Sequence, residues 1–210
     1  MPYYFSYNMP AYEYAPKGLS PEEGIARLKE GNERFMAEAL KNERFSAARR
    51  LSLVEGQSPF AVIVCCSDSR VPPEEIFDQG LGELFVVRTA GHVADESALG
   101  SIEYAVAFLG ASLVVVLGHE DCGAVCAAMS GKQHIGYMKS VVEAVKPAVE
   151  DVKASLGNDL PAAIQANIRY VVERIQRAEP YLSSRVAEGR VRVVGALYTF
   201  RDGKVTFLDS

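Results

Sequence analysis

Residues 60–70 read FAVIVCCSDSR, a continuous apolar run that ends in a cluster of polar and charged side chains. An apolar run without alternation is typical of a strand that is buried on both faces of a parallel sheet. The same pattern recurs at residues 113–123, which read LVVVLGHEDCG. Two buried strands are therefore predicted, over 60–66 and 113–118, and polar residues follow each of them at once.

The remaining chain alternates between extended and helical patterns. Further strands are predicted over 84–88, 191–196 and 204–208, the last two paired through a turn at Asp202-Gly203. Helices are predicted from Ser20, from Asp95 to about Leu109, from about Cys122, and over 138–154 and 161–178. This alternation predicts a single α/β domain with a mostly parallel central β-sheet flanked by helices.

The domain is expected to occupy residues 20–210 and to begin with an N-terminal helical arm. Its start, Ser20-Pro21-Glu22-Glu23, has the pattern of a capped helix with proline in the first turn. Residues 1–19 are rich in Tyr and Pro and show no period. We expect them to form either a flexible tail or an aromatic arm that lies on a partner subunit.

Composition narrows the class of protein. The 210 residues are 49% hydrophobic and 23% charged, as in ordinary globular proteins, and the net charge is −5. No Lys/Arg-rich run points to a nucleic-acid partner. No apolar run reaches the roughly 18 residues that a membrane span needs. The N-terminus lacks the basic start and apolar stretch of a secretory signal, so the predicted location is the cytoplasm.

The polar ends of the two buried strands predict a metal site. In a reducing compartment, paired cysteines suggest metal ligation or catalysis before disulfides. Ligands bind outside the carboxyl ends of parallel strands, where Cys66 would meet His119 and Cys122. Two thiolates and one imidazole suit zinc, and three ligands leave a fourth position open, as in catalytic sites. One zinc ion per chain is expected.

Asp68 and Arg70 follow the first ligand at spacings of two residues each. Asp68 can accept a hydrogen bond from zinc-bound water while Arg70 holds it in a bidentate pair. Alternatively, an unpaired Asp68 closes the zinc as a fourth ligand, and the spacing does not rank these two states. Each motif alone has a plain structural interpretation, as an incidental His/Cys pair or a polar helix cap. Their joint position at two strand ends favours the metal site.

Four other residues that could bind metal or protons are assigned structural or no roles. Cys65 faces away from Cys66 across the strand. Cys126 lies one helical turn beyond Cys122 and is expected in the core. His92 is interpreted as a hydrogen-bonding structural residue in preference to a proton relay. His134 is expected in an exposed loop and is given no role.

Residues 57–128 resemble the β-class carbonic anhydrases. The first metal motif of that family resembles residues 66–70, and the second resembles residues 118–123. The stretches over 85–91 and 101–106 are also similar. The resemblance implies that Cys66, His119 and Cys122 bind zinc. It also implies that Asp68 and Arg70 form the catalytic dyad.

The resemblance further implies a substrate pocket shared between subunits, and hence a homodimer or a dimer of dimers. Gln57 matches a glutamine that binds substrate across the subunit interface. Phe85, Ala90 and Tyr104 match residues that wall the pocket, and Ala90 stands where larger aliphatic residues are common. From the residues alone, Phe85 is predicted to be a core residue and Tyr104 a surface or interface residue.

The predicted activity is the zinc-dependent reversible hydration of carbon dioxide to bicarbonate by metal-bound hydroxide, which is that of a carbonate dehydratase. Two alternatives stay open. One is hydrolysis of carbonyl sulfide or carbon disulfide on the same scaffold, with selectivity set by access and oligomer packing. The other is a non-catalytic zinc protein whose site Asp68 keeps closed.

Overall fold

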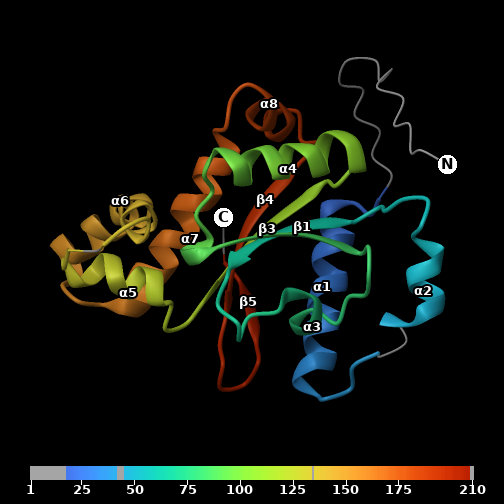
Figure 1. The fold of residues 1–210 in the computed structure, drawn as a ribbon, viewed down its shortest axis with the longest axis horizontal. Helices are drawn as coiled ribbons and strands as arrows, with labels where there is room; N and C mark the ends of the chain where they lie inside the picture. Colours follow the sequence, from blue (N-terminus) through green and yellow to red (C-terminus); the bar gives the residue numbers. More distant parts are fainter. Residues whose placement is uncertain (1–17, 42–44, 134, 209–210) are drawn as a thin grey trace.

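A computed structural model of the chain describes residues 18–41, 45–133 and 135–208 (Figure 1). Its sheet has the strand order β2-β1-β3-β4-β5. The first four strands are parallel, and β5 pairs with β4 in the antiparallel direction. The strands are β1 (Ala61–Cys66), β2 (Leu84–Thr89), β3 (Leu113–His119), β4 (Arg192–Tyr198) and β5 (Val205–Phe207). The mostly parallel sheet predicted from the sequence is thus confirmed.

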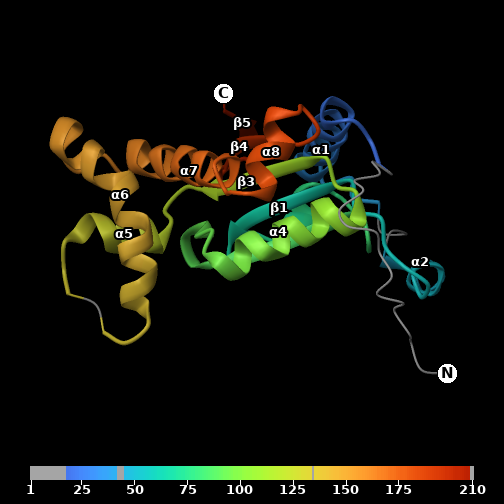
Figure 2. The same ribbon diagram turned by 90° about the horizontal axis from the view of Figure 1, so that it is seen from above.

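Helices cover both faces of this sheet. The five predicted from the sequence are α1 (Pro21–Met36), α4 (Glu96–Leu109), α5 (Gly123–Ser130), α6 (Met138–Leu156) and α7 (Leu160–Gln176). Four short elements were not predicted, namely α2 (Ala47–Ser52), α3 (Pro73–Ile76), α8 (Tyr181–Ala187) and the 3-10 turn η2 (Ala90–His92). In both views α5 and α6 lie beyond one side of the sheet, and α2 lies on the opposite side (Figures 1 and 2).

Side-chain caps fix the starts of α1 and α4, two of the predicted helices. Ser20 and Glu23 form a reciprocal capping box at the start of α1. The Asp95 carboxylate accepts a hydrogen bond from the Ala98 amide at 2.9 Å and so caps α4. The same helix ends at Gly110, whose left-handed backbone costs little because it has no Cβ.

The alternation of side chains along β1 divides the core into two layers. Val62, Val64 and Cys66 pack into a cluster with α4, α5, α6, α7 and α8. Ala61, Ile63 and Cys65 face the other cluster, which contains residues of α1 and α3. Because successive side chains of a strand point to opposite faces, Cys65 lies away from Cys66, as predicted.

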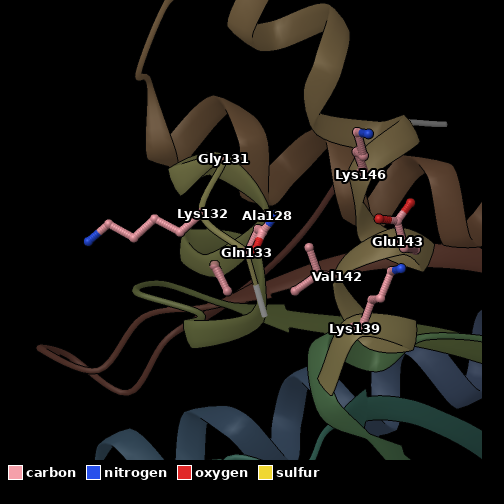
Figure 3. A pocket seen from close by; sticks show the side chains of 9 residues that line it. Ala128, Gly131, Lys132, Gln133, Lys139, Val142, Glu143 and Lys146 are labelled. Carbon is pink, nitrogen blue, oxygen red and sulfur yellow. The ribbon is translucent and has the colours of Figure 1, made fainter. Parts of the chain in front are cut away.

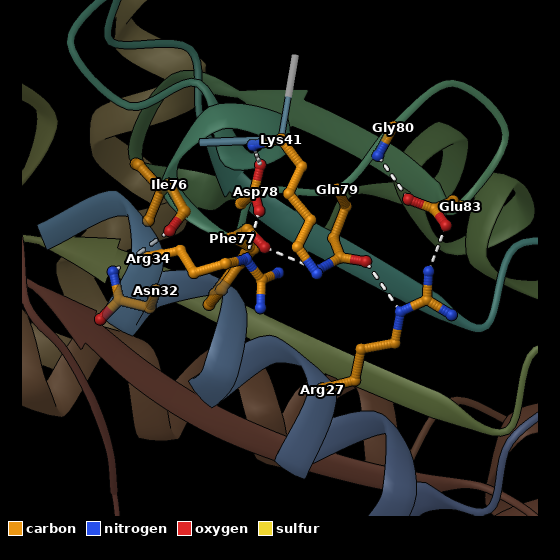
Figure 4. A network of polar contacts seen from close by, with 10 residues as sticks. All are labelled: Arg27, Asn32, Arg34, Lys41, Ile76, Phe77, Asp78, Gln79, Gly80 and Glu83. Carbon is orange, nitrogen blue, oxygen red and sulfur yellow. Dashed lines mark hydrogen bonds and ion pairs between the residues drawn. The ribbon is translucent and has the colours of Figure 1, made fainter. Parts of the chain in front are cut away.

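A polar network fastens α1 to the segment between α3 and β2 (Figure 4). Arg27 donates to the Gln79 side chain at 2.9 Å and forms an ion pair with Glu83, while Arg34 forms one with Asp78. Asn32 is buried within the same helix and donates to the Gly203 carbonyl at 2.8 Å. These contacts pin the N-terminal helix against the second core cluster.

The predicted aromatic arm over residues 1–19 falls almost wholly outside the described residues, as does His134. Within the described part of the chain, no helix has both the length and the apolar character needed to cross a membrane.

Candidate metal centre

The topology of the sheet brings the carboxyl ends of β1 and β3 together. The two strands are parallel neighbours, and Cys65 pairs in register with Leu117. The chain continues from β1 towards one edge of the sheet and from β3 towards the other, so their ends flank a topological switch point. Ligands bind at such points in open α/β sheets. Cys66 and His119 are the last residues of these two strands.

Cys122 joins this pair from the start of the next helix. It is the N-cap residue of α5, and Asp121 before it adopts a left-handed backbone with φ of 52°. The ligand atoms of Cys66, His119 and Cys122 all lie within 4.8 Å of one another, and all three residues are buried. The structure therefore brings together the three ligands that the sequence predicts.

The imidazole of His119 is oriented for metal binding. Its Nδ1 lies 2.8 Å from the Glu120 carbonyl, which can only accept, so Nδ1 carries the proton. The other nitrogen, Nε2, is then a lone-pair donor. It is buried and has no hydrogen-bond partner among the described residues. A metal ion beside the two thiols would satisfy this buried atom.

The sulfur atoms of Cys66 and Cys122 together carry one negative charge, because the Cys122 thiol keeps its proton and donates it in a hydrogen bond to the Cys66 thiolate. The pKa of Cys66 lies far below that of an ordinary thiol, because the Cys122 thiol and the Gly91 amide both donate to its sulfur. The pKa of Cys122 is raised in consequence. A cation that replaces the shared proton allows both sulfurs to ionise. Together with the free imidazole nitrogen, this donor set fits zinc.

Asp68 lies beside the cluster but is held by Arg70. The guanidinium donates to the two carboxylate oxygens at 3.0 and 2.7 Å, in a bidentate pair. These bonds hold the pKa of Asp68 far below its usual range. Asp68 Oδ2 also lies 4.0 Å from His119 Nε2. Of the two states that the sequence left open, the structure contains the one in which Asp68 is paired.

Two residues that the sequence analysis missed, Phe200 and Arg88, support the pair formed by Asp68 and Arg70. Phe200 lies under the Arg70 guanidinium, 4.1 Å from ring centroid to Cζ, and its ring also packs on His119 at 5.5 Å. Arg88 donates to the carbonyls of Cys66 and Asp68 at 3.1 and 2.6 Å. A charged residue near the end of an apolar strand was a signal for Arg88. Phe200 lies 130 positions beyond Arg70, and no local pattern links the two.

The two acidic residues after His119 take different surroundings. Glu120 is half-buried, and its carboxylate accepts a hydrogen bond from the Phe200 amide. Asp121 is exposed to solvent. Glu120 therefore fixes the segment that carries Phe200.

The structure does not bring all of the predicted pocket residues to this cluster. Phe85 packs on Tyr104 with ring centroids 6.2 Å apart, and Tyr104 is 41% exposed. Phe85 pairs with Val62, four residues before Cys66, which places it about 13 Å back along the sheet. Gln57 is exposed and precedes β1, so it lies near the amino edge of the sheet. Ala90, exposed in η2, directly precedes the residue that bonds Cys66.

The structure shows the burial and the contacts of the residues that were assigned no metal role. Cys65 is buried, and burial raises its pKa to about 12. His92 is fully buried and pairs with Asn167, which agrees with a structural role. The expected burial of Cys126 is wrong, because this residue is exposed. Helix α5 packs through its other side, by Val125, Ala128 and Met129.

Two hollows lie outside the cluster, one of them next to it in the fold. One of about 480 Å³ lies between α5 and α6 and is bordered by Lys132, Lys139 and Lys146 (Figure 3). Another of about 190 Å³ lies beside Glu120 and Asp121. Their linings, among the described residues, include none of the three cluster ligands. In this single chain, then, the cluster does not open into either hollow.

Comparisons with known proteins agree with the fold and the donor set. A family model for carbonic anhydrase matches residues 61–205. Carbonic anhydrase 2 of Mycobacterium tuberculosis is 45% identical over 186 residues, covering 87% of this chain and 90% of that protein. The carbonic anhydrase of Mycolicibacterium smegmatis is 43% identical over 183 residues, covering 85% of this chain and 88% of that protein.

Solved structures show the same architecture. The β-carbonic anhydrase CcaA is similar with a TM-score of 0.68 and 30% identity, covering 89% of this chain and 95% of that chain. A structure from a study of two tetrameric β-carbonic anhydrases of Sordaria macrospora has a TM-score of 0.68 at 24% identity, covering 90% and 98% respectively.

The chain therefore belongs to the carbonic anhydrase family, and within it to the β-class. Zinc is the cofactor of this class, in agreement with the Cys-His-Cys donor set.

Proposed function

We propose that this protein catalyses the reversible hydration of carbon dioxide to bicarbonate at a zinc ion held by Cys66, His119 and Cys122. The observation that carries the proposal is the buried three-donor cluster with an ionised carboxylate beside it. Three protein ligands leave one tetrahedral position for the reacting group. The relatives named carbonic anhydrase support the choice of substrate.

Zinc in such a site lowers the pKa of bound water to about 7 and so supplies a nucleophile at neutral pH. Asp68 remains ionised through its pair with Arg70, and an ionised carboxylate can only accept hydrogen bonds. We propose that Asp68 Oδ2 accepts the O–H of the nucleophile. That contact turns an oxygen lone pair towards the carbon of the substrate.

Arg70 serves this step through Asp68. Its guanidinium holds both carboxylate oxygens and rests on the Phe200 ring, so the carboxylate is fixed at two points. The same pairing argues against a non-catalytic site that Asp68 closes, because a carboxylate held by Arg70 is not free to ligate. Loss of Arg70 would release Asp68 towards the metal position.

The substrate pocket is proposed to form between two chains. Ala90 lies in the turn next to the Cys66 sulfur of its own chain. Phe85 lies about 13 Å back along the sheet from that sulfur, Tyr104 packs on Phe85 and is 41% exposed, and Gln57 precedes β1. We propose that these three face the metal centre of a partner subunit in a homodimer or a dimer of dimers. Residues 1–19 are proposed to lie on the same partner.

The cytoplasm is the proposed location. All four cysteines are free thiols, and two of them belong to the metal cluster. Such sulfur ligands must stay reduced, which a reducing compartment ensures.

The test of this function compares two carboxylates near the cluster. We expect Asp68→Asn to retain zinc and to lose about 100-fold or more in carbon dioxide hydration, because the acceptor is replaced by an amide. The matched control is Asp121→Asn, which removes an exposed carboxylate from a left-handed position that asparagine tolerates. An unchanged rate in zinc-loaded Asp68→Asn would refute the role given to Asp68.

Turnover of carbonyl sulfide and carbon disulfide on the same preparation separates the substrates. We expect carbon dioxide to be the preferred gas by a wide margin. A preference for either sulfur gas would move the assignment to the hydrolase alternative while leaving the metal site intact.

A further inference from the structure

We infer that Asn167, on α7, is a positioning residue for the Cys66 sulfur and acts through the turn Gly91-His92. The inference rests on the proposed zinc site. According to this inference, a residue of α7 helps to set how strongly the Cys66 thiolate donates electrons to the metal.

The first step is the hydrogen bond that the turn supplies. The Gly91 amide donates to Cys66 Sγ at 3.3 Å. A hydrogen bond to a thiolate withdraws electron density from the sulfur. Partners of this kind, one shell out from the metal, tune its affinity and its acidity.

The second step is the unusual backbone that aims this amide. Gly91 has a φ of 66° and the following residue, His92, has a φ of 46°. Two successive residues with left-handed backbone are unusual, and a residue with a side chain, such as histidine, rarely adopts this conformation unless its surroundings hold it there. A Cβ at position 91 would lie 2.8 Å from the Ala124 Cβ, so the turn also packs tightly against α5.

The third step is the contact that holds the turn. The Asn167 amide donates to the Gly91 carbonyl at 3.1 Å and lies 2.9 Å from His92 Nε2. Both residues of the turn are thus tied to the side chain of Asn167, which is 1% exposed. The Gly91 carbonyl can only accept, so the amide nitrogen must face it, and its second hydrogen points to Nε2.

The network leaves two buried polar atoms without partners among the described residues, Asn167 Oδ1 and His92 Nδ1. Leaving such atoms unpaired destabilises a fold; an apolar residue at position 167 would remove the unpaired Oδ1 but would also take the Asn167 donor away from the Gly91 carbonyl and His92 Nε2. Asparagine is therefore poorly explained by packing alone. Its two donated bonds, which fix the turn and so aim the Gly91 amide at Cys66, account for it.

The experiment uses the full chain loaded with Co²⁺, whose absorption reports the sulfur ligands. We compare Asn167→Ala with Asn32→Ala, a matched control that also removes a buried, hydrogen-bonded asparagine but lies in α1 (Figure 4). Both variants should lose thermal stability. In Asn167→Ala the sulfur-to-cobalt charge-transfer band should move to longer wavelength, because the sulfur is more electron-rich once the turn relaxes. Chelator competition should show zinc affinity changed by about 10-fold.

The outcomes separate this inference from the proposed function. An unchanged band and unchanged zinc affinity in Asn167→Ala would show that Asn167 only packs, and would overturn the inference alone. A wild-type protein that takes up neither cobalt nor zinc would overturn the metal site and the inference with it. Should Asn167→Ala fail to fold, Asn167→Ser keeps one hydroxyl donor and should show a smaller shift in the same direction. No shift in that variant would count against the inference.

Discussion

At the scale of single residues, the metal cluster is surrounded by side chains from distant parts of the sequence: Phe200 packs on Arg70 and His119, and Asn167 bonds the Gly91 carbonyl. Asp68 and Arg70 could be assigned from their spacing after a buried strand, and the bidentate pair confirms that geometry. Phe200 and Asn167 could not, since they contact Arg70 and Gly91, respectively, from distant parts of the chain. Cys126 shows a different limit, because spacing of one helical turn does not say which side of a helix is buried.

The burial of His92 predicts how the stability of the protein depends on pH. Burial lowers its pKa from 6.5 to about 4 in the folded protein. Between these values the unfolded chain binds a proton that the folded chain does not, so stability should fall as the pH falls through this window. Through this group, stability below about pH 4 should be lower than stability above about pH 6.5 by on the order of 3 kcal/mol.

The measurement is urea unfolding of the wild type and of His92→Asn at several pH values between these limits. Asparagine tolerates the left-handed backbone at this position. The variant should lose part of the pH dependence, whatever its absolute stability. Parallel curves for the two proteins would show that His92 is not the group that titrates.

At the scale of elements, long apolar periods were predictable and short elements were not. The buried strands and α4 were predicted nearly to the residue, because the strands are continuous apolar runs and α4 has both a helical period and a capping residue. In contrast, α3 has 4 residues and η2 has 3, too few to show a helical period. These short turns are nevertheless the elements that place Ala90 and support the end of α1.

The packing of α1 against α3 yields a second prediction. A Cβ added at Gly31 would lie 1.7 Å from the Phe77 carbonyl oxygen, so the helix cannot keep its place with any larger residue. We expect Gly31→Ala to lower the free energy of unfolding by about 2 kcal/mol or more. Glu30→Ala, at the exposed neighbouring position, should change it by less than about 0.5 kcal/mol.

Thermal or urea unfolding of the two variants tests this packing. Equal stability of Gly31→Ala and Glu30→Ala would mean that α1 can move away from α3 without cost. The close approach would then not be what fixes the helix.

At the scale of the whole molecule, the fold class followed from the alternation of strands and helices, but completion of the site did not. A single chain places the metal ligands at the carboxyl ends of the strands and Gln57 near the amino end of β1. No pattern within one sequence shows which surfaces meet. The subunit arrangement was inferred from the resemblance to a family, and for this chain it is a proposal.

Subunit mixing tests that arrangement. Cys66→Ala removes a metal ligand and Gln57→Ala removes a proposed partner contact, so each variant alone should be nearly inactive. In a mixed dimer, one site has both an intact cluster and an intact Gln57. Random reassociation at equal amounts should therefore restore about a quarter of wild-type activity. Activity no higher than the average of the two variants would place Gln57 and the cluster in the same chain, or give Gln57 no role.

The most direct test of the central claim is stopped-flow hydration of carbon dioxide by the purified protein, with zinc measured in the same sample. At about pH 7, where zinc in such a site supplies its nucleophile, we predict rapid turnover in proportion to zinc content. Removal of zinc by a chelator should abolish the activity, and added zinc should restore it. A protein that holds one zinc ion per chain and does not hydrate carbon dioxide would contradict the account.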